Sequence, residues 1–330
     1  MTTQRRPFLS FSVRLDGVWD VITLLALAGS WLGLLGRWHW LLDLFSHFRW
    51  QYLLLAALAV LWSWWRKRRT VLGVSIATLV LNAWLIGSLW WHTQSPDDIS
   101  QPSLRIVSFN VLTSNRHYHE VIDHLQAADA DILFLVEIDD SWAEALEPLK
   151  ASHPHHLFLP RQDNFGLALL SRLPLLELRK LNTREAESEA FSFAMPSIEA
   201  RLSRDGQELT LIGTHPLPPV GKLQSISRNS QLTEIARYVQ SLGQAAMVLG
   251  DLNSTPWCEG MRSLRSLGSL DFRATSPPWQ PTWRVNSVLA IPIDHVLCTP
   301  PLVIVKREIG SDVGSDHRAQ IIDVGWPSPH

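Results

Sequence analysis

Polar side chains stand at the points where apolar segments of this 330-residue chain end. The clearest case is MVLGDLNSTPW, Met247–Trp257, in which an apolar segment runs directly into Gly250-Asp251-Leu252-Asn253. Asp and Asn after a strand are often turn formers. A carboxylate and a carboxamide placed this closely could also serve a catalytic site. The other segments of the chain help to decide between these two interpretations.

Further apolar segments end or begin with polar residues in the same way. These residues are Asn110, Glu137, His215, Asp294 and the pair Asp316-His317. Glu137, Asp316 and Asn110 supply the oxygen ligands that a hard divalent cation needs. A histidine with an orienting carboxylate can neutralise charge or move a proton in phosphoryl transfer. Each position alone has an ordinary explanation as a turn former or a solvated side chain, but six such positions in this order favour one common site.

These positions fall in six short motifs, and the motifs carry a resemblance. They are SFNVL, LFLVEI, LIGTHPLPP, LGDLNSTP, IDHVL and GSDHRA. In this order the chain resembles the endonuclease/exonuclease/phosphatase superfamily, the metal-dependent phosphoesterases with a DNase I-like fold. The resemblance implies an α+β fold, a four-layer α/β/β/α sandwich with the active site at one rim. The apolar N-terminal third also resembles that of membrane-anchored bacterial members.

The resemblance implies a role for each acidic or amide residue of the motifs. Glu137 and Asp316 would be the principal ligands of Mg²⁺ or Mn²⁺, with Asn110 beside them. The metal would bind a phosphate oxygen and offset the charge of the leaving oxygen. Asp251 and Asn253 would orient the attacking water, and Asp251 would be one of two candidates to deprotonate it.

The same resemblance implies roles for two histidines. His317 would contact the phosphoryl group or act as the general base, with Asp294 fixing its tautomer and orientation. His215 would contact the scissile phosphate or assist the leaving group. Some relatives give this histidine its own carboxylate partner, and Asp163 and Glu199 are the candidates in this chain.

The expected elements alternate between strands and helices after residue 103. Strand-like segments cover 104–111, 131–136, 166–170, 197–202, 208–214, 246–249, 293–297, 302–305 and 320–324, and helical patterns cover 117–128, 141–150, 222–242 and 259–267. Arg204-Asp205-Gly206-Gln207 is a hairpin turn signal. Strands outnumber helices, and hairpins mix with crossovers, which favours mixed sheets covered by helices.

The first third of the chain is a predicted membrane anchor. Apolar segments at about 19–36, 50–65 and 71–91 are close to the length of roughly 20 residues that crosses a bilayer. Eleven of the sixteen Trp lie before residue 104, several of them near the ends of these segments, where an interfacial belt is expected. We therefore expect an anchor of three transmembrane helices over 1–92, a linker over 93–103 and a phosphoesterase domain over 104–330.

The distribution of basic residues predicts the orientation of the anchor. Arg5, Arg6 and Arg14 precede the first apolar segment, and Arg66-Lys67-Arg68-Arg69 separates the second from the third. The positive-inside rule puts both regions in the cytoplasm. Three spans then leave the domain after residue 103 outside the cytoplasm. The expected location is a bacterial inner membrane, with the catalytic domain facing the periplasm.

The chain is predicted to hydrolyse phosphodiester bonds, and nucleic acid is the leading candidate for the substrate. A nuclease needs a basic groove, and residues 104–330 hold 20 Lys and Arg against 26 Asp and Glu, a formal charge of −6. Local clusters such as Arg161 and Arg172 could still bind phosphates. A phospholipid or sphingolipid phosphodiesterase at the membrane surface is the alternative, and a non-catalytic binding protein on the same fold is the second. No protein partner is implied.

Three other features have competing interpretations. The cluster HPHH, from His153 to His156, suggests zinc but lacks a second ligand pair at suitable spacing, so a solvated loop is expected. Cys258 and Cys298 could form a disulfide in an oxidising compartment, or stay unpaired. Trp257 could line a substrate cleft or pack under the following helix.

Overall fold

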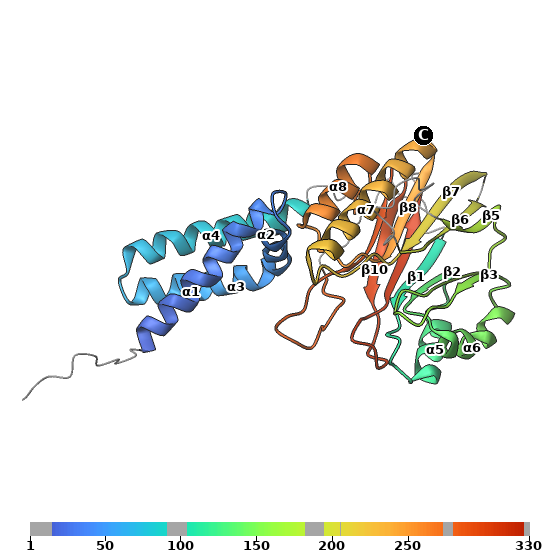
Figure 1. Cartoon of the computed structure of the whole chain (residues 1–330), viewed down its shortest axis with the longest axis horizontal. Helices are drawn as coiled ribbons and strands as arrows, with labels where there is room; N and C mark the ends of the chain where they lie inside the picture. Colours follow the sequence, from blue (N-terminus) through green and yellow to red (C-terminus); the bar gives the residue numbers. More distant parts are fainter. Residues whose placement is uncertain (1–14, 91–103, 182–194, 205, 273–279, 327–330) are drawn as a thin grey trace, which may run out of the picture.

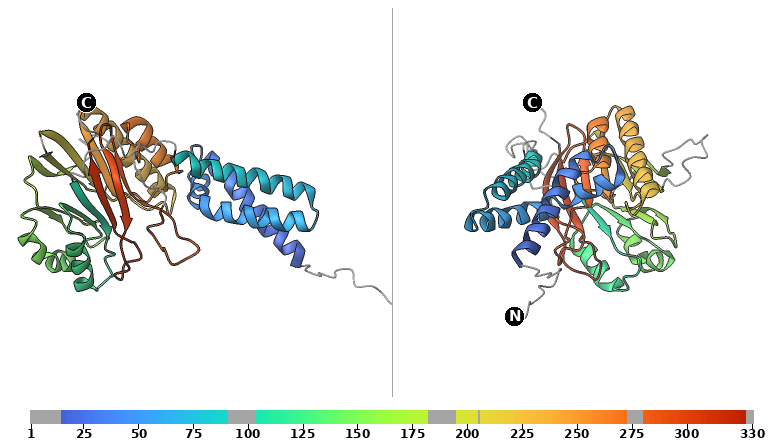
Figure 2. Two further views of the ribbon diagram at one scale, coloured as in Figure 1. Left: turned by 180° about the vertical axis from the view of Figure 1, so that it is seen from behind. Right: turned by 60° about the vertical axis from the view of Figure 1, so that its left-hand side comes forward.

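The chain folds into a slender helical bundle joined to a broad two-sheet sandwich (Figures 1 and 2). The structure is a computed structural model that describes residues 15–90, 104–181, 195–204, 206–272 and 280–326. The proposed linker 93–103, Trp91 at the end of the third apolar segment and Asp205 of the hairpin signal lie outside the described residues.

The bundle contains three helices that are long and apolar enough to cross a membrane, spanning Gly17–Leu35, Trp40–Trp65 and Arg69–Gly87. Its elements are α1 (Leu15–Leu32), η1 (Gly33–Leu35), α2 (Trp40–Leu44), η2 (Phe45–Phe48), α3 (Arg49–Trp65), α4 (Arg69–Gly87) and η3 (Ser88–Trp90). At about 1.5 Å per residue, the 19 residues of α4 extend close to the roughly 30 Å of a bilayer core. Many outward side chains are large and apolar, among them Leu25, Leu54 and Trp64.

Polar side chains inside the bundle pair with one another. Asn82 on α4 donates to the Ser30 hydroxyl at 2.8 Å, and Trp31 donates to Thr78 at 3.0 Å. Arg49 donates to the carbonyl of Ser30 at 2.7 Å. Hydrogen bonds of this kind hold apolar helices together where burial of apolar surface gives little driving force.

The first sheet has the strand order β10-β11-β1-β2-β4-β3. Its strands are β1 (Leu104–Asn110), β2 (Ile132–Val136), β3 (His155–Leu159), β4 (Leu167–Ser171), β10 (Val303–Ile309) and β11 (Gln320–Gly325). β1 and β2 are parallel, whereas β11 runs antiparallel to β1. The sheet is therefore mixed, as expected.

The second sheet has the order β5-β6-β7-β8-β9. Its strands are β5 (Glu177–Leu181), β6 (Ser197–Arg204), β7 (Gln207–Thr214), β8 (Ala245–Asp251) and β9 (Asp294–Cys298). β7 and β8 are parallel, and β9 is antiparallel to β8. β6 and β7 form the expected hairpin, which closes at the pair Arg204↔Gln207.

The two sheets pack face to face through a shared apolar core, which includes Ile106, Phe134, Leu211 and Met247. On the outer faces, α5 (Tyr118–Ala127), α6 (Asp140–Ala145) and η5 (Glu147–Ala151) lie on the first sheet, and α7 (Lys222–Leu242) and α8 (Glu259–Gly268) lie on the second (Figure 1). The layers follow the order helix, sheet, sheet, helix, so the predicted four-layer α/β/β/α sandwich is confirmed.

The expected elements differ from the observed ones in a few places. β3 and β5 were not expected, because HHLFL and ELRKL show no clean alternation of apolar and polar residues. Both are edge strands, which have a neighbouring strand on one side only, so their side chains are less completely buried than those of central strands. The helix expected over 141–150 is instead α6 followed by η5, since Pro148 follows α6 and removes a backbone donor.

One end of the bundle is packed against the sandwich. Asp43 of α2 forms a buried ion pair with Arg228 of α7 at 2.8 Å and accepts a hydrogen bond from the amide of Glu259 at 2.9 Å. Trp257 donates to the carbonyl of Leu85 at 3.0 Å. The start of α1 and the α3–α4 connection lie at the opposite end of the bundle (Figure 1). The short segment between the first two long helices is thus built into the sandwich.

Candidate active site

Strand topology explains why the polar residues of the motifs meet. Asn110 ends β1 and Glu137 follows β2, and these strands are parallel neighbours, so both residues lie at one edge of the first sheet. Asp251 ends β8, and the antiparallel partner β9 begins with Asp294 directly opposite it. The Asp316-His317 pair precedes β11, beside the end of β1. Both sheets therefore present their polar strand ends at the same rim.

Asp251 lies at the centre of this group. Its Oδ2 accepts a hydrogen bond from Asn110 Nδ2 at 3.1 Å, and it lies 3.4 Å from His215 Nε2 and 3.7 Å from His317 Nε2. Its Oδ1 accepts from the amide of Asn253 at 2.9 Å. Burial alone would raise the pKa of Asp251, but the two imidazoles and the hydrogen bonds outweigh burial and lower it. Asp251 is therefore held as a carboxylate.

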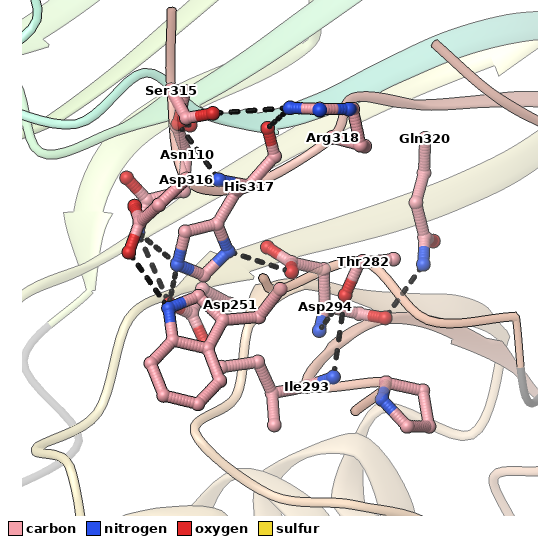
Figure 3. A network of polar contacts seen from close by, with 12 residues as sticks. Asn110, Asp251, Thr282, Ile293, Asp294, Ser315, Asp316, His317, Arg318 and Gln320 are labelled. Atoms are coloured by element: carbon pink, nitrogen blue, oxygen red, sulfur yellow. Dashed lines mark hydrogen bonds and ion pairs between the residues drawn. The ribbon is translucent and has the colours of Figure 1, made fainter. Parts of the chain in front are cut away.

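His317 is held between two carboxylates (Figure 3). Its Nδ1 lies 2.8 Å from Asp294 Oδ2, and its backbone amide donates to the Ser315 hydroxyl at 3.0 Å. Asp294 is fixed in turn, because its amide donates to Thr282 Oγ1 at 3.2 Å. Burial would lower the pKa of His317, but the charges of Asp294 and Asp251 raise it to about 10. The geometry is that of an imidazole oriented by a carboxylate, with Nε2 left to face the cavity.

Glu137 lies in a strained but well-supported position. Its backbone φ is +67°, a value that non-glycine residues rarely adopt. Its Oε1 accepts from Asn110 Nδ2 at 2.9 Å, and its Oε2 accepts from the amide of Thr113 at 3.0 Å. Strain of this kind persists only where the surroundings fix it, and it is concentrated at functional sites.

Asp316 is held by a tryptophan that the motifs did not identify. Trp283 Nε1 donates to Asp316 Oδ2 at 2.8 Å. Trp283 also forms isolated strand bridges to Ile291 and His317. Trp283 and Thr113 both escaped the sequence analysis because their roles depend on contacts made only in three dimensions.

His215 does not have the carboxylate partner that the resemblance suggested. Glu199 accepts hydrogen bonds from Arg179 and Tyr238, and Asp163 pairs with Arg161. Neither is bound to His215, so both candidates were wrong. Within the described part of the chain, the buried His215 Nδ1 has no hydrogen-bond partner. Its ring instead lies 5.1 Å from that of Phe165, and its Nε2 lies 3.4 Å from Asp251 Oδ2.

The loop after β8 is held from several sides. Gly250 has φ +133°, and a Cβ built there would lie 2.1 Å from the carbonyl oxygen of Thr214, so only glycine fits. Asn253 has φ +47°. Its side chain donates to the carbonyl of Pro216 at 3.0 Å, and its own carbonyl accepts from Arg228 Nη1 at 3.0 Å. The polar turn seen in the sequence is thus a rigid support for Asp251.

Side chains of the motifs line a cavity of about 670 Å³, among them Glu137, His215 and His317. Four carboxylates line it, those of Glu137, Asp163, Asp251 and Asp316, and none of the described residues in its wall is Lys or Arg. Glu137 and Asp316 therefore carry negative charge that no Lys or Arg in the described wall balances. Carboxylate oxygens without a basic partner suit a hard divalent cation, so the residues present fit Mg²⁺ or Mn²⁺.

The side chains that could bind a metal ion form two sets. The ligand atoms of Asp251, Asp294 and His317 all lie within 4.8 Å of one another. Asp294 and His317 already bind each other at 2.8 Å, however. Glu137 and Asp316 have no cationic partner among the described residues and remain the better suited to a metal ion.

The remaining sequence features do not belong to the site. His153 is buried and lies within hydrogen-bond distance of the carbonyl of Ala130, and His155 begins β3, so the expected solvated loop at HPHH is wrong. Cys258 and Cys298 are both buried and do not form a disulfide with each other, and the Cys298 thiol donates to the carbonyl of Leu302 at 3.3 Å. Trp257 lies outside the cavity wall and packs between the sandwich and the anchor.

The wall of the cavity also contains residues that no motif suggested. Leu44, His47 and Phe48, from α2 and η2, line it together with the polar side chains of the motifs. They come from the connection between the first two long helices, about 60 residues before Asn110 in the sequence. No local pattern marks them, because only the docking of the bundle brings them to the site.

Comparison with known proteins agrees with this geometry. A family model described as the Endonuclease/Exonuclease/phosphatase family matches residues 107–317. D. rerio TDP2 complexed with single strand DNA product has a TM-score of 0.53 at 18% identity over 67% of this chain and 98% of that chain. The human nocturnin catalytic domain with bound sulfate has a TM-score of 0.54 at 18% identity over 69% and 96% of the two chains.

Sphingomyelinase C from Streptomyces griseocarneus has a TM-score of 0.50 at 16% identity over 68% of this chain and 100% of that chain. At these identities the likeness establishes the DNase I-like fold. Comparison with curated protein sequences gave no significant match. Because the family model covers most of the sandwich and more than half of the whole sequence, the chain belongs to the endonuclease/exonuclease/phosphatase family.

Proposed function

We propose that this chain is a membrane-anchored phosphoesterase that uses a divalent metal ion to hydrolyse phosphodiester bonds. The observation that carries the proposal is the buried pair His317–Asp294 beside Asp251, at the rim of a cavity that also holds Glu137 and Asp316. Such a set combines an oriented imidazole with carboxylates for a cation and for water.

Each residue has a proposed task. Glu137 and Asp316, with Asn110 beside them, hold Mg²⁺ or Mn²⁺, which when bound offsets the charge on the phosphoryl oxygens. Asp251 orients the attacking water, while the rigid loop at Asn253 keeps that carboxylate in place.

The two histidines act on the phosphoryl group. His317 contacts it through Nε2, since Asp294 binds the other ring nitrogen. His215 lies next to the scissile phosphate on the side of Asp251. Water adds its oxygen to phosphorus as one ester P–O bond breaks, and the departing alcohol oxygen takes up a proton. Asp251 and His317 are the two candidates for the residue that takes the proton of the attacking water. The kcat values of the Asp251→Asn and His317→Ala variants, compared with each other, test which of the two has this role and which contacts the phosphate.

The proposed organisation follows the sequence. Residues 1–92 form the membrane anchor, 93–103 the linker and 104–330 the phosphoesterase domain. The basic residues of 66–69 are at the end of the bundle remote from the sandwich (Figure 1), which supports a cytoplasmic position for that end and a periplasmic domain in a bacterial inner membrane. An alkaline phosphatase fusion after residue 95 should be active, and an inactive fusion would contradict this orientation.

Two substrate classes have support from the solved structures. Nucleic acid is suggested by the complex of TDP2 with a single-stranded DNA product. A lipid headgroup is suggested by the sphingomyelinase, and by an anchor that keeps the site near a membrane. A non-catalytic protein is disfavoured, because every metal and histidine position of the motifs is occupied by the expected residue type.

The test uses the full chain in nanodiscs with bis(p-nitrophenyl) phosphate, a small chromogenic phosphodiester. Mg²⁺ or Mn²⁺ should support hydrolysis, EDTA should abolish it, and Glu137→Ala and His317→Ala should each lower the rate by at least about 100-fold. Glu144→Ala and His119→Ala, which change exposed residues of α6 and α5, are the matched controls. If both site variants kept the parental rate, the assigned site would be wrong.

A further inference from the structure

The cavity wall combines polar and apolar side chains. Titratable groups of the motifs line it, among them Glu137, Asp251 and His317. Large apolar side chains line it as well, Leu44 and Phe48 of the helical bundle and Val220 and Ile291 of the sandwich. A substrate that fills the cavity would therefore combine a phosphate with an apolar group.

The anchor residues in this wall are held firmly in place. Asp43, next to Leu44, is tied to Arg228 and to the backbone of Glu259. Gln51, at the start of α3, donates to the carbonyls of Val288 and Ala290 at 3.2 and 3.0 Å. Leu44 and Phe48 thus line the cavity where the sandwich meets the membrane-crossing helices.

Exposed apolar side chains of the sandwich gather at the same place. Among the described residues after 103, most large apolar side chains that are exposed belong to two segments, 220–226 and 288–289. Val220 is 77% exposed, Leu223 69% and Val288 86%. The first segment adjoins α7, against which α2 packs, and the second is bound by Gln51. Apolar surface of this kind beside a membrane anchor is suited to insertion at the bilayer interface.

The wall of the cavity is also unsuited to a polyanion. Nucleic acid binding depends on Lys and Arg that neutralise successive phosphates. None of the described residues in the wall is Lys or Arg. The two arginines that the sequence offered for this purpose are paired with acids, Arg161 with Asp163 and Arg172 with Asp129. One phosphate can be bound by a metal at Glu137 and Asp316 and by His317, but a second one along the cavity has no Lys or Arg in the described wall to bind it.

We infer that the substrate is a membrane lipid phosphodiester whose apolar part stays in contact with the bilayer along Leu44, Phe48 and Val220 while its phosphate reaches His317. This inference rests on the proposed phosphoesterase function and specifies its substrate class. Water adds to phosphorus and one ester P–O bond breaks, which yields an alcohol and a phosphomonoester without any change of oxidation state.

The experiment uses the full chain in nanodiscs of phosphatidylethanolamine and phosphatidylglycerol, with Mn²⁺. Three kinds of substrate are offered: membrane lipid, as the nanodisc lipids themselves and as a short-chain lipid with the same headgroup, bis(p-nitrophenyl) phosphate, and a single-stranded oligonucleotide. Products are identified by mass spectrometry. The inference expects kcat/KM for a long-chain lipid to exceed that for a short-chain lipid with the same headgroup by at least about 10-fold, because each buried methylene adds binding energy.

Variants test whether the apolar wall is responsible. Val220→Ser, at an exposed position that does not threaten folding, should lower the ratio of lipid to bis(p-nitrophenyl) phosphate kcat/KM by about fivefold. Leu176→Ser is the matched control, since Leu176 is 58% exposed and lies outside the cavity wall, and it should leave that ratio unchanged.

The outcomes separate the two proposals. Hydrolysis of bis(p-nitrophenyl) phosphate with intact lipids, cleavage of the oligonucleotide in preference to lipid, or an unchanged ratio in Val220→Ser would overturn the lipid inference and leave the phosphoesterase function standing. If none of the three substrates were hydrolysed under any divalent metal, the proposed function itself would fail, and the lipid inference with it.

Discussion

Replacing Asp43 with Asn should destabilise the protein, although Asp43 is far from the motifs in the sequence. The Arg228 side chain is fully buried, and Asp43 is the only carboxylate paired with it among the described residues. Loss of one partner of a buried ion pair leaves an uncompensated charge and costs about 3–5 kcal/mol. Because the amide oxygen of Asn can still accept a hydrogen bond, we expect the lower end, about 3 kcal/mol.

This cost has a measurable consequence for unfolding. A change of 1 kcal/mol moves the Tm of a domain of this size by about 2–4 °C, so the Asp43→Asn variant should melt about 6–12 °C below the parent. Intrinsic tryptophan fluorescence in matched nanodiscs measures the shift. Activity should fall as well, because Arg228 also donates to the carbonyl of Asn253 in the loop that carries Asp251.

A double-mutant cycle separates the ion pair from general damage to the interface. Asp43→Leu combined with Arg228→Met removes both charges and should recover most of the Tm lost in Asp43→Leu alone, since paired removal of a buried ion pair is often neutral. The reasoning is refuted if Asp43→Asn melts with the parent, or if the losses of the two single variants simply add.

Three further changes have definite expected results. Gly250→Ala should lower the free energy of unfolding, measured by urea titration, by about 2 kcal/mol or more. Gly206→Ala is the control, because Gly206 also has a positive φ but open space around it, and it should cost about 1 kcal/mol. Equal losses in the two variants would contradict the proposed clash at Gly250. Asp294→Asn should reduce kcat by about 100-fold or more with little change in KM, because the imidazole loses its orienting carboxylate, and a purely higher KM in steady-state assays would argue against that role. Trp283→Phe removes the donor to Asp316 and should raise the Mn²⁺ concentration for half-maximal activity by about 10–100-fold, and an unchanged metal titration would show that this hydrogen bond does not tune the site.

The strand ends were predictable from sequence because a polar residue there interrupts a run of buried apolar residues. An apolar strand that stops at a carboxylate, as at Glu137 and Asp251, breaks its own pattern, and the break is visible without a structure. Parallel pairing of β1 with β2 and of β7 with β8 then brings such ends together. The edge strands β3 and β5 were missed because an edge needs neither a continuous apolar run nor strict alternation.

The supports of the site were largely invisible in the sequence. Trp283 and Thr113 act through hydrogen bonds to Asp316 and Glu137, and nothing in their own neighbours indicates it. The carboxylate partner sought for His215 was wrong for the same reason, because Glu199 on β6 points to Arg179 and Tyr238. Contacts of this kind depend on which faces of the elements meet, and sequence patterns describe only which faces are apolar.

The anchor residues Leu44 and Phe48 in the cavity wall have a kinetic consequence. In the proposed anchored enzyme, a site completed by these residues would stay at the membrane, so it would meet its substrate by lateral motion within a surface. Its rate would follow the mole fraction of substrate in that surface, and diluting the substrate with inert lipid would slow it at constant bulk concentration. A phosphate that never comes within reach of the bilayer would escape hydrolysis, whatever chemical group it carries.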